Sequence, residues 1–189
     1  MKKSILTSLF CTALVMALSA QREETLFGRG YGLSGIWGSA THNYSFFDDD
    51  FAYARGGSIG LEFGNDIFVG YAWQKFRDDA QPEDINQDFR LRYNGFLLGI
   101  TPNAHRAIHP RISMLLGGGR ATLGNGDSDR VFIFQPALGL ELNVFQWFRL
   151  GLEGGYRLVG NESLLGVEST DLSSPFAQID LRFGFSWGR

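Results

Sequence analysis

The chain has 189 residues, of which 44% are hydrophobic and 20% are charged, and its 17 basic and 20 acidic residues give a formal net charge of -3. This length fits one domain after removal of an export leader, and the acidic balance argues against a nucleic-acid partner. The only cysteine, Cys11, lies in the leader, so the sequence predicts a mature chain without disulfides or cysteine metal sites.

Residues 1–20 have the pattern of a cleaved signal peptide. Two lysines precede an apolar run from Ile5 to Leu18, and we expect cleavage after Ala20, which leaves one domain over residues 21–189. Loss of two lysines and no acids changes the formal charge from -3 (17 minus 20) to -5 (15 minus 20). No later apolar run approaches the roughly 20 residues of a membrane-spanning helix, so any membrane crossing must use strands.

Eight stretches in which apolar and polar residues alternate follow the leader, and alternation predicts strands with two unlike faces. Their lengths suit the roughly 9 to 11 residues with which a tilted strand crosses a bilayer. In chain order the predicted strands are Gly28–Ala40, Phe51–Phe63, Ile67–Phe76, Phe89–Ile100, Arg111–Thr122, Arg130–Asn143, Trp147–Val159 and Pro175–Trp187.

Two of these strands are irregular. In the fourth, Arg90 and Arg92 share a parity with Phe96, so we predict a bulge near Gly95 that switches the face. In the sixth, Pro136 removes a hydrogen-bond donor from the ladder and is the weakest point of that strand.

The connections alternate in length. Short ones follow the second and sixth strands, at 64–66 and 144–146, and a medium one covers 101–110, whereas the others are longer and acidic. Short turns at one end and longer loops at the other are typical of outer-membrane barrels whose two termini lie in the periplasm. The loop acids predict a solvated surface, with divalent-cation binding that bridges to lipopolysaccharide phosphates as the alternative. These acids are Asp48, Asp49, Asp50, Asp78, Asp79, Glu83, Asp84, Asp88, Asp127, Asp129, Glu162, Glu168 and Asp171.

Alternation does not decide which face points inward. A secreted lipocalin-type barrel has a leader and eight strands but turns its apolar face toward a ligand, and Gly35-Ile36-Trp37 matches the short motif of that family. Two features favour the inverted arrangement, with apolar residues outside. The mature chain has one lysine, Lys75, and its polar parity is rich in glycine, which suits a narrow lumen.

With the polar parity inside, charged residues gather in the lumen, where each must be paired. A three-residue turn at 144–146 would place Glu141 opposite Arg149, so we predict that ion pair, with Asp180 and Arg157 or Arg149 as neighbours. The network predicts a structural plug; a proton or ion path is the alternative. The predicted lumen residues are Glu62, Arg90, Arg92, Glu141, Arg149, Glu153, Arg157, Asp180 and Arg182.

Aromatic residues near the strand ends indicate the two girdles of a membrane barrel. They are Tyr71, Trp73, Trp147, Phe148, Phe183 and Trp187. In this organisation the mature chain resembles the small outer-membrane barrels of the OmpX and OmpA transmembrane-domain type, and Phe183, Phe185 and Trp187 resemble their closing assembly signal.

The resemblance implies an all-β, eight-stranded, antiparallel up-and-down transmembrane barrel with short periplasmic turns and longer acidic outer loops. It further implies a location in the outer membrane of a Gram-negative bacterium. The partners would be outer-membrane lipids and lipopolysaccharide, with periplasmic chaperones and the outer-membrane assembly machinery during biogenesis. The sequence does not indicate an oligomeric state.

Residues for three further chemistries are present in the sequence. His42, Ser45 and Asp48 contain the groups of a hydrolytic triad, and lipid A-modifying enzymes are barrels of this size, but residues 21–27 are too short for the N-terminal helix of the acyltransferases. His105 and His109 are four apart without a convincing helix, so neither a metal nor another cofactor is expected. Pro136 and the glycines at 117–119 could open the wall sideways for small hydrophobic molecules, as in OmpW-like barrels. We expect a non-enzymatic barrel with a structural or surface-interaction role.

Overall fold

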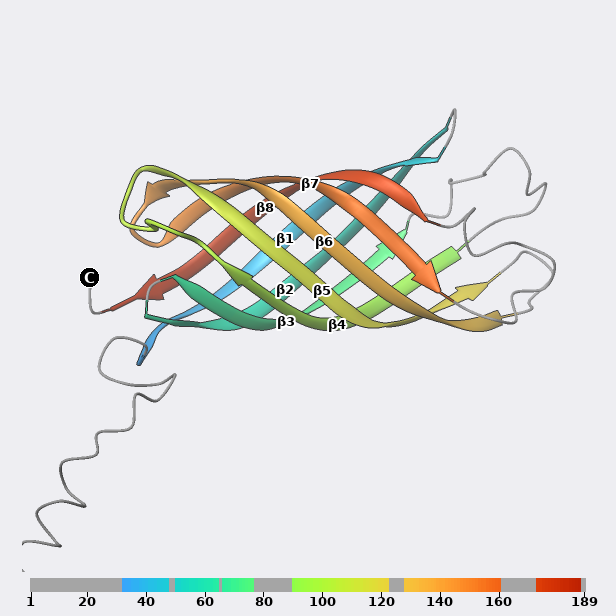
Figure 1. The fold of residues 1–189 in the computed structure, drawn as a ribbon, viewed down its shortest axis with the longest axis horizontal. Helices are drawn as coiled ribbons and strands as arrows, with labels where there is room; N and C mark the ends of the chain where they lie inside the picture. The colour runs from blue at the N-terminus through green and yellow to red at the C-terminus, as the bar shows by residue number, and fades with distance from the viewer. Residues whose placement is uncertain are drawn as a thin grey trace, which may run out of the picture. The chain divides into compact units, whose positions relative to one another are not determined.

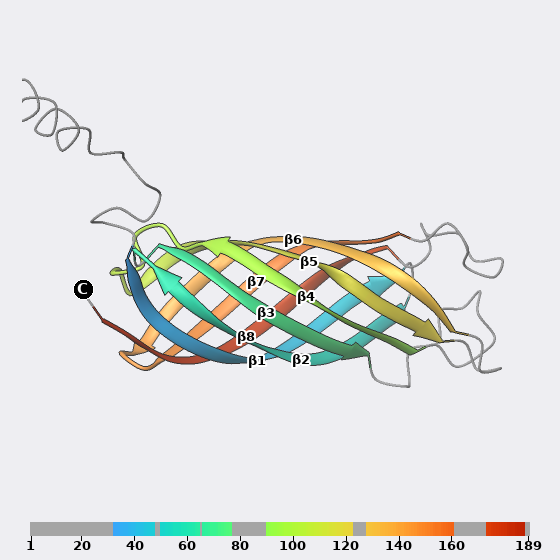
Figure 2. The same cartoon turned by 90° about the horizontal axis from the view of Figure 1, so that it is seen from below.

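The computed structural model describes residues 32–47, 50–64, 66–76, 90–122, 128–160 and 173–187, and within these ranges eight strands close into one antiparallel barrel (Figure 1, Figure 2). Each strand pairs with its neighbours in the chain, and β1 pairs with β8. The predicted up-and-down barrel is confirmed. Its strands are β1 (Leu33–Phe47), β2 (Asp50–Phe63), β3 (Ile67–Phe76), β4 (Arg90–Ile100), β5 (Ile108–Thr122), β6 (Ser128–Phe145), β7 (Phe148–Gly160) and β8 (Ser174–Ser186).

The two faces of the barrel wall differ as the alternation predicts. On β7 and β8, Leu152 and Phe183 are 46% and 47% exposed. Arg149 and Glu153, on the opposite parity of β7, are only 6% and 4% exposed. On these strands the apolar parity therefore faces outward and the polar parity faces the lumen, which is the reverse of a lipocalin-type barrel. The lumen also holds a cluster of buried apolar side chains, among them Phe76, Leu91 and Ile133.

The first strand differs most from its predicted range, because β1 runs from Leu33 to Phe47 instead of from Gly28 to Ala40. The residues expected in a loop continue the alternation, with Thr41 and Asn43 buried inside and Tyr44 exposed outside. Polar residues that face a polar lumen look like loop residues in a sequence. The expected long connection between the first two strands is consequently reduced to residues 48 and 49.

Three connections lie at one end of the barrel, which we call the turn end; the opposite end is the loop end. Gly64 and Asn103 both have φ of 60°, in the turns that follow β2 and β4. Between β6 and β7, Phe145 pairs with Phe148, and the register shifts between Asn143 and Phe145. The predicted three-residue turn at 144–146 is therefore wrong, and Asn143 rather than Glu141 lies opposite Arg149.

The two irregular strands have different outcomes. β4 pairs continuously with β3 from Ile67–Ile100 to Lys75–Arg92, so the predicted bulge near Gly95 is absent. In β6, the pairing with β7 passes from Phe134–Leu158 to Ala137–Gly155 and skips Pro136, as its missing donor requires. On its other edge, Pro136 lies opposite Met114 of β5 within an unbroken register.

Several features of the sequence lie outside the described residues. These are the leader at 1–20 and all of the loop acids except Asp50 and Asp129. The described part of the chain contains no helix that is long and apolar enough to cross a membrane.

Candidate functional site

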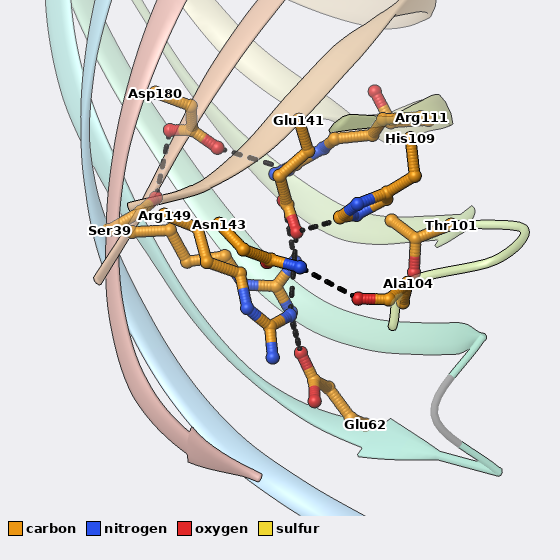
Figure 3. A network of polar contacts seen from close by, with 12 residues as sticks. Ser39, Glu62, Thr101, Ala104, His109, Arg111, Glu141, Asn143, Arg149 and Asp180 are labelled. Atoms are coloured by element: carbon orange, nitrogen blue, oxygen red, sulfur yellow. Dashed lines mark hydrogen bonds and ion pairs between the residues drawn. The ribbon is translucent and has the colours of Figure 1, made fainter. Parts of the chain in front are cut away.

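Four carboxylates and four arginines are buried inside the barrel. At the turn end, Glu141 lies between basic side chains from three strands, as Figure 3 shows for His109, Arg111 and Arg149. Its carboxylate oxygens lie 2.8 Å from Arg111 Nη1, 3.4 Å from Arg149 Nη1 and 3.2 Å from Arg182 Nη1. Glu141 is 0% exposed, so these charges compensate one another without water at that carboxylate.

Arg111 joins three carboxylates through its guanidinium fork. Its Nη1 donates to Glu141 at 2.8 Å, its Nη2 donates to Asp180 at 3.0 Å, and its Nε lies 3.2 Å from Glu153 Oε1. The planar group directs its donors in several fixed directions, which a lysine would not reproduce. Arg111 is therefore the centre of what we call the ionic network, formed by Glu62, His109, Arg111, Glu141, Arg149, Glu153, Asp180 and Arg182.

The other carboxylates of the network also have neutral donors. Glu62 accepts from Ser186 Oγ at 2.6 Å as well as from Arg149 and Arg182. Asp180 accepts from Ser39 and Thr41 at 2.9 and 2.7 Å. Hydroxyls on neighbouring strands thus complete the hydrogen bonding of the buried carboxylates, as burial in a low dielectric requires.

His109 completes the network at its turn-end edge. Its Nδ1 lies 3.1 Å from the carbonyl oxygen of Arg106, and its Nε2 lies 3.3 Å from Glu141 Oε1. Both partners are acceptors, so both contacts become hydrogen bonds only when the ring carries two protons. A doubly protonated His109 would balance the four carboxylates against three arginines and one imidazolium.

Arg157 lies apart from the ionic network, and its partners within the described ranges are neutral. It donates to Ser45 Oγ at 2.7 Å, Asn43 Oδ1 at 2.9 Å and Gln135 Oε1 at 3.1 Å. Three aromatic rings complete what we call the Arg157 cage, with centroids 4.8 to 5.6 Å from its guanidinium carbon; they belong to Phe76, Tyr93 and Phe176. Cation–π contacts and amide oxygens replace a carboxylate partner among the described residues.

Glycine makes room for Trp37, the described tryptophan that points into the lumen. Trp37 is 4% exposed, and the guanidinium carbon of Arg182 lies 4.1 Å from its ring centroid. A Cβ atom at Gly60 would lie 2.5 Å from Trp37 Cζ2, and one at Gly70 would lie 3.1 Å from the same atom. Gly60 of β2 and Gly70 of β3 therefore leave room for the indole, and Arg182 lies over its ring.

Little free space separates these groups. One cavity of about 20 Å³ lies beside Thr41, Gln74, Arg111 and Gln178, and one of about 10 Å³ lies beside Glu62 and Arg149. A cavity of this size holds about one water molecule.

The structure places seven of the nine predicted lumen residues inside the barrel: Glu62, Glu141, Arg149, Glu153, Arg157, Asp180 and Arg182. Arg90 and Arg92 were wrongly assigned to the lumen, because β4 has no bulge and both side chains are exposed on its outward face. Glu141 and Arg149 do contact each other, and Asp180 contacts Arg111 instead of Arg157 or Arg149. Sequence reasoning missed Arg111 and His109, although both share the inward parity with Ser113.

The predicted girdle residues are partly at the strand ends. At the turn end, Trp147, Phe148 and Phe183 form one aromatic cluster, with ring centroids 5.0 to 6.2 Å apart, and Trp187 follows β8. Trp73 is exposed near the loop end of β3. Tyr71 instead lies in the middle of β3, where it contacts Phe96. Tyr44 and Tyr53, which sequence reasoning missed, are adjacent outward-facing rings near the loop end, at 5.3 Å.

The remaining candidate chemistry is not assembled. His42 faces outward and hydrogen-bonds the Tyr53 hydroxyl through Nδ1 at 2.5 Å, whereas Ser45 points inward to Arg157. Asp48 lies outside the described residues. His105 is exposed in the turn while His109 is buried against Glu141. Among the described residues no group of three or more His, Cys, Asp and Glu side chains could hold a metal ion.

Among the comparisons with known proteins, the one with solved structures identifies the fold. No protein-family model matches the sequence, and no curated protein is similar enough to match. Among solved structures, Neisserial surface protein A is 16% identical with a TM-score of 0.61, covering 82% of this chain and 97% of its own. The N-terminal β-barrel domain of Pseudomonas aeruginosa OprF is 15% identical with a TM-score of 0.60, covering 81% and 98%. Ail, the attachment invasion locus protein of Yersinia pestis, is 14% identical with a TM-score of 0.52, covering 81% and 99%. The chain therefore has the fold of the small eight-stranded outer-membrane barrels.

Proposed function

We propose that this chain is a non-enzymatic β-barrel of a bacterial outer membrane, with a plugged lumen and a structural or surface-interaction role. The observation that carries the proposal is the inverted distribution of side chains. Leucine, isoleucine and aromatic residues cover the outside of all eight strands, while guanidinium and carboxylate groups are buried inside. Such a surface is unfavourable in water and matches the apolar band that a lipid bilayer surrounds.

The plug is supported by the ionic network and the Arg157 cage. They cross the lumen with hydrogen bonds between strands far apart around the barrel, and the two cavities beside these groups have about the volume of one water molecule each. An ion would have to break several buried charge pairs to pass. The turn end, where β1 begins and β8 ends, would face the periplasm, and the loop end would face the cell exterior.

Cell fractionation with heat-modifiable gel mobility tests the location. The proposal expects the protein in the outer-membrane fraction, with different mobility in boiled and unboiled samples. A soluble periplasmic protein with one mobility would refute it. Planar-bilayer recording tests the plug separately: we expect no stable conductance, and a long-lived open state would show that the lumen conducts.

Two alternatives make different predictions. A lipid A-modifying enzyme would change the mass spectrum of lipid A on overexpression, and His42→Ala would abolish that change. The opposite orientation of His42 and Ser45 argues against it. Passage of hydrophobic molecules through the wall near Pro136 would require β6 to separate from β7. A disulfide between Leu138→Cys and Gly154→Cys, which pair across these strands where Gly154 has room for a Cβ atom, would stop such passage.

A further inference from the structure

Five basic residues lie side by side on the outward face near the loop end. Cross-strand pairing joins them in one continuous series, which we call the basic row: Arg55, Lys75, Arg92, Arg120 and Arg130 on strands β2 to β6. The four arginines are exposed, and Lys75 is half-buried. Four inter-strand spacings of about 4.8 Å give the row a length of roughly 19 Å.

This arrangement is electrostatically unfavourable by itself, because like charges directly opposite each other on adjacent strands repel. Within the described part of the chain, no residue of the basic row makes an ion pair, in contrast to Arg111, Arg149 and Arg182 of the lumen. The chain has more acidic than basic residues, yet it gathers five cations in one row. Only an anion from outside the described residues can neutralise these cations.

The basic row lies at the edge of the apolar wall. Eight residues along each strand separate it from the row that contains Phe63, Ile67 and Ile100. This separation is about 26 Å along a strand. It corresponds to roughly 20 Å along the barrel axis, because the strands are tilted by about 40° to that axis. The rows between are apolar or mixed; Ile59, Tyr71, Phe96, Leu116 and Phe134 form the middle one. Directly paired residues lie along a line perpendicular to the strands, so the row runs obliquely around the barrel and changes height by roughly 12 Å over its length at a tilt of about 40°. Since the apolar band of a membrane barrel is about 25 Å tall, the end of the row that lies higher along the barrel reaches the level where lipid headgroups begin.

A shallow hollow adjoins the row. Gly118 has no side chain and lies between Asn94 and Phe132 on the neighbouring strands. The depression has a volume of about 700 Å³, and Trp73, Lys75, Arg92, Arg120 and Arg130 are among the residues that border it. It offers an aromatic side at Trp73 and a basic rim.

We propose that the basic row and this hollow bind a lipid of the surrounding outer leaflet whose headgroup carries two or more phosphates. Guanidinium forks bind phosphate oxygens in pairs, and a series of cations about 4.8 Å apart matches clustered phosphates better than a single phosphate. Acyl chains would lie on the apolar rows below. A soluble anion would gain nothing from those rows, which is why we assign the site to a lipid. The inference rests on the membrane location proposed above.

The test uses the folded mature chain in nanodiscs of phosphatidylcholine doped with diphosphoryl lipid A, and it counts retained lipid A by native mass spectrometry. Parallel samples contain monophosphoryl lipid A or soluble pyrophosphate. The variant Lys75→Gln/Arg92→Gln/Arg120→Gln removes the centre of the row, and Arg92→Lys/Arg120→Lys keeps its charge. The single variant Arg92→Gln has Arg106→Gln as its matched control, because Arg106 is an exposed arginine in a turn at the opposite end of the barrel. Heat-modifiable mobility shows that each variant is folded.

We expect the triple glutamine variant to retain roughly tenfold less diphosphoryl lipid A, because three exposed charge contacts of about 0.5 kcal/mol together correspond to that factor. The lysine variant should lose less of the retained diphosphoryl lipid A, and Arg106→Gln should lose none. Monophosphoryl lipid A should bind more weakly than diphosphoryl lipid A to every variant. Equal retention by the folded triple variant would overturn the inference, and would indicate that the neighbouring loop acids neutralise the row. Equal binding of pyrophosphate and lipid A would assign the site to soluble anions instead. A chain that does not insert into nanodiscs at all would refute the proposed location rather than the lipid site.

Discussion

Replacing Arg111 with glutamine should destabilise the barrel far more than the same change at a surface arginine five residues earlier. Arg111 is 1% exposed and contacts Glu141, Glu153 and Asp180 at 2.8 to 3.2 Å. Without it, the four carboxylates of the ionic network retain two arginines and His109. Removing one partner from a buried ion pair costs about 3 to 5 kcal/mol, and we expect a loss of unfolding free energy in that range.

The assay is equilibrium urea unfolding of the barrel in lipid vesicles, followed by tryptophan fluorescence. Arg106→Gln removes the same charge from an exposed side chain and should change the unfolding free energy by less than about 0.5 kcal/mol. Adding Asp180→Asn to Arg111→Gln restores part of the charge balance, so the double variant should cost less than the sum of the single ones. A difference of less than about 1 kcal/mol between Arg111→Gln and Arg106→Gln would show that the network does not hold the barrel together.

Three further outcomes follow from the same contacts. Arg157→Gln should cost about 1 to 3 kcal/mol in urea titrations, less than Arg111→Gln, because its neutral partners leave no carboxylate unpaired; an equal loss would contradict this. Trp37→Ala should cost about 3 to 5 kcal/mol by the same method, since it leaves a cavity above the glycines and uncovers Arg182, and a cost near zero would mean that the lumen collapses into the space. Trp187→Ala should lower the heat-modifiable fraction in cells, because its Nε1 donates to the Leu33 carbonyl at 3.0 Å where β8 meets β1, and unchanged assembly would exclude a role in closure.

Much of the barrel could be predicted because one physical signal, the alternation of two unlike faces, runs through the whole mature chain. Seven strand ranges agree with the structure to within three residues at either end. The signal failed at residues 41–47, where inward-facing Thr41, Asn43 and Ser45 made a strand look like a loop. Polarity alone cannot distinguish side chains that face a polar lumen from side chains that face water.

The lumen network was predictable in its composition but not in its pairing. Parity identified Glu141, Arg149 and Asp180 as inward, whereas their partners depend on turn geometry and on strands that are distant in the chain. The bulge between Asn143 and Phe145 moved the register by an amount that the sequence did not indicate. On β4, the two arginines were assigned to the lumen through an expected bulge near Gly95, whereas an unbroken parity puts them outside with Phe96. An arginine on the outward face is reasonable once its height along the barrel is known.

The long sequence separations within the ionic network also bear on how fast the barrel opens. Arg111 and Asp180 are 69 residues apart, Arg149 and Glu62 are 87 apart, and Arg182 and Glu62 are 120 apart. The Arg111–Asp180 pair needs the ribbon to curl, and the two Glu62 pairs also need β8 to approach β1, so we expect these charges to stay hydrated through most of folding. Interactions that form after the rate-limiting step slow unfolding without accelerating folding. The network would then act chiefly as a kinetic lock, which lengthens the lifetime of a barrel once it has closed.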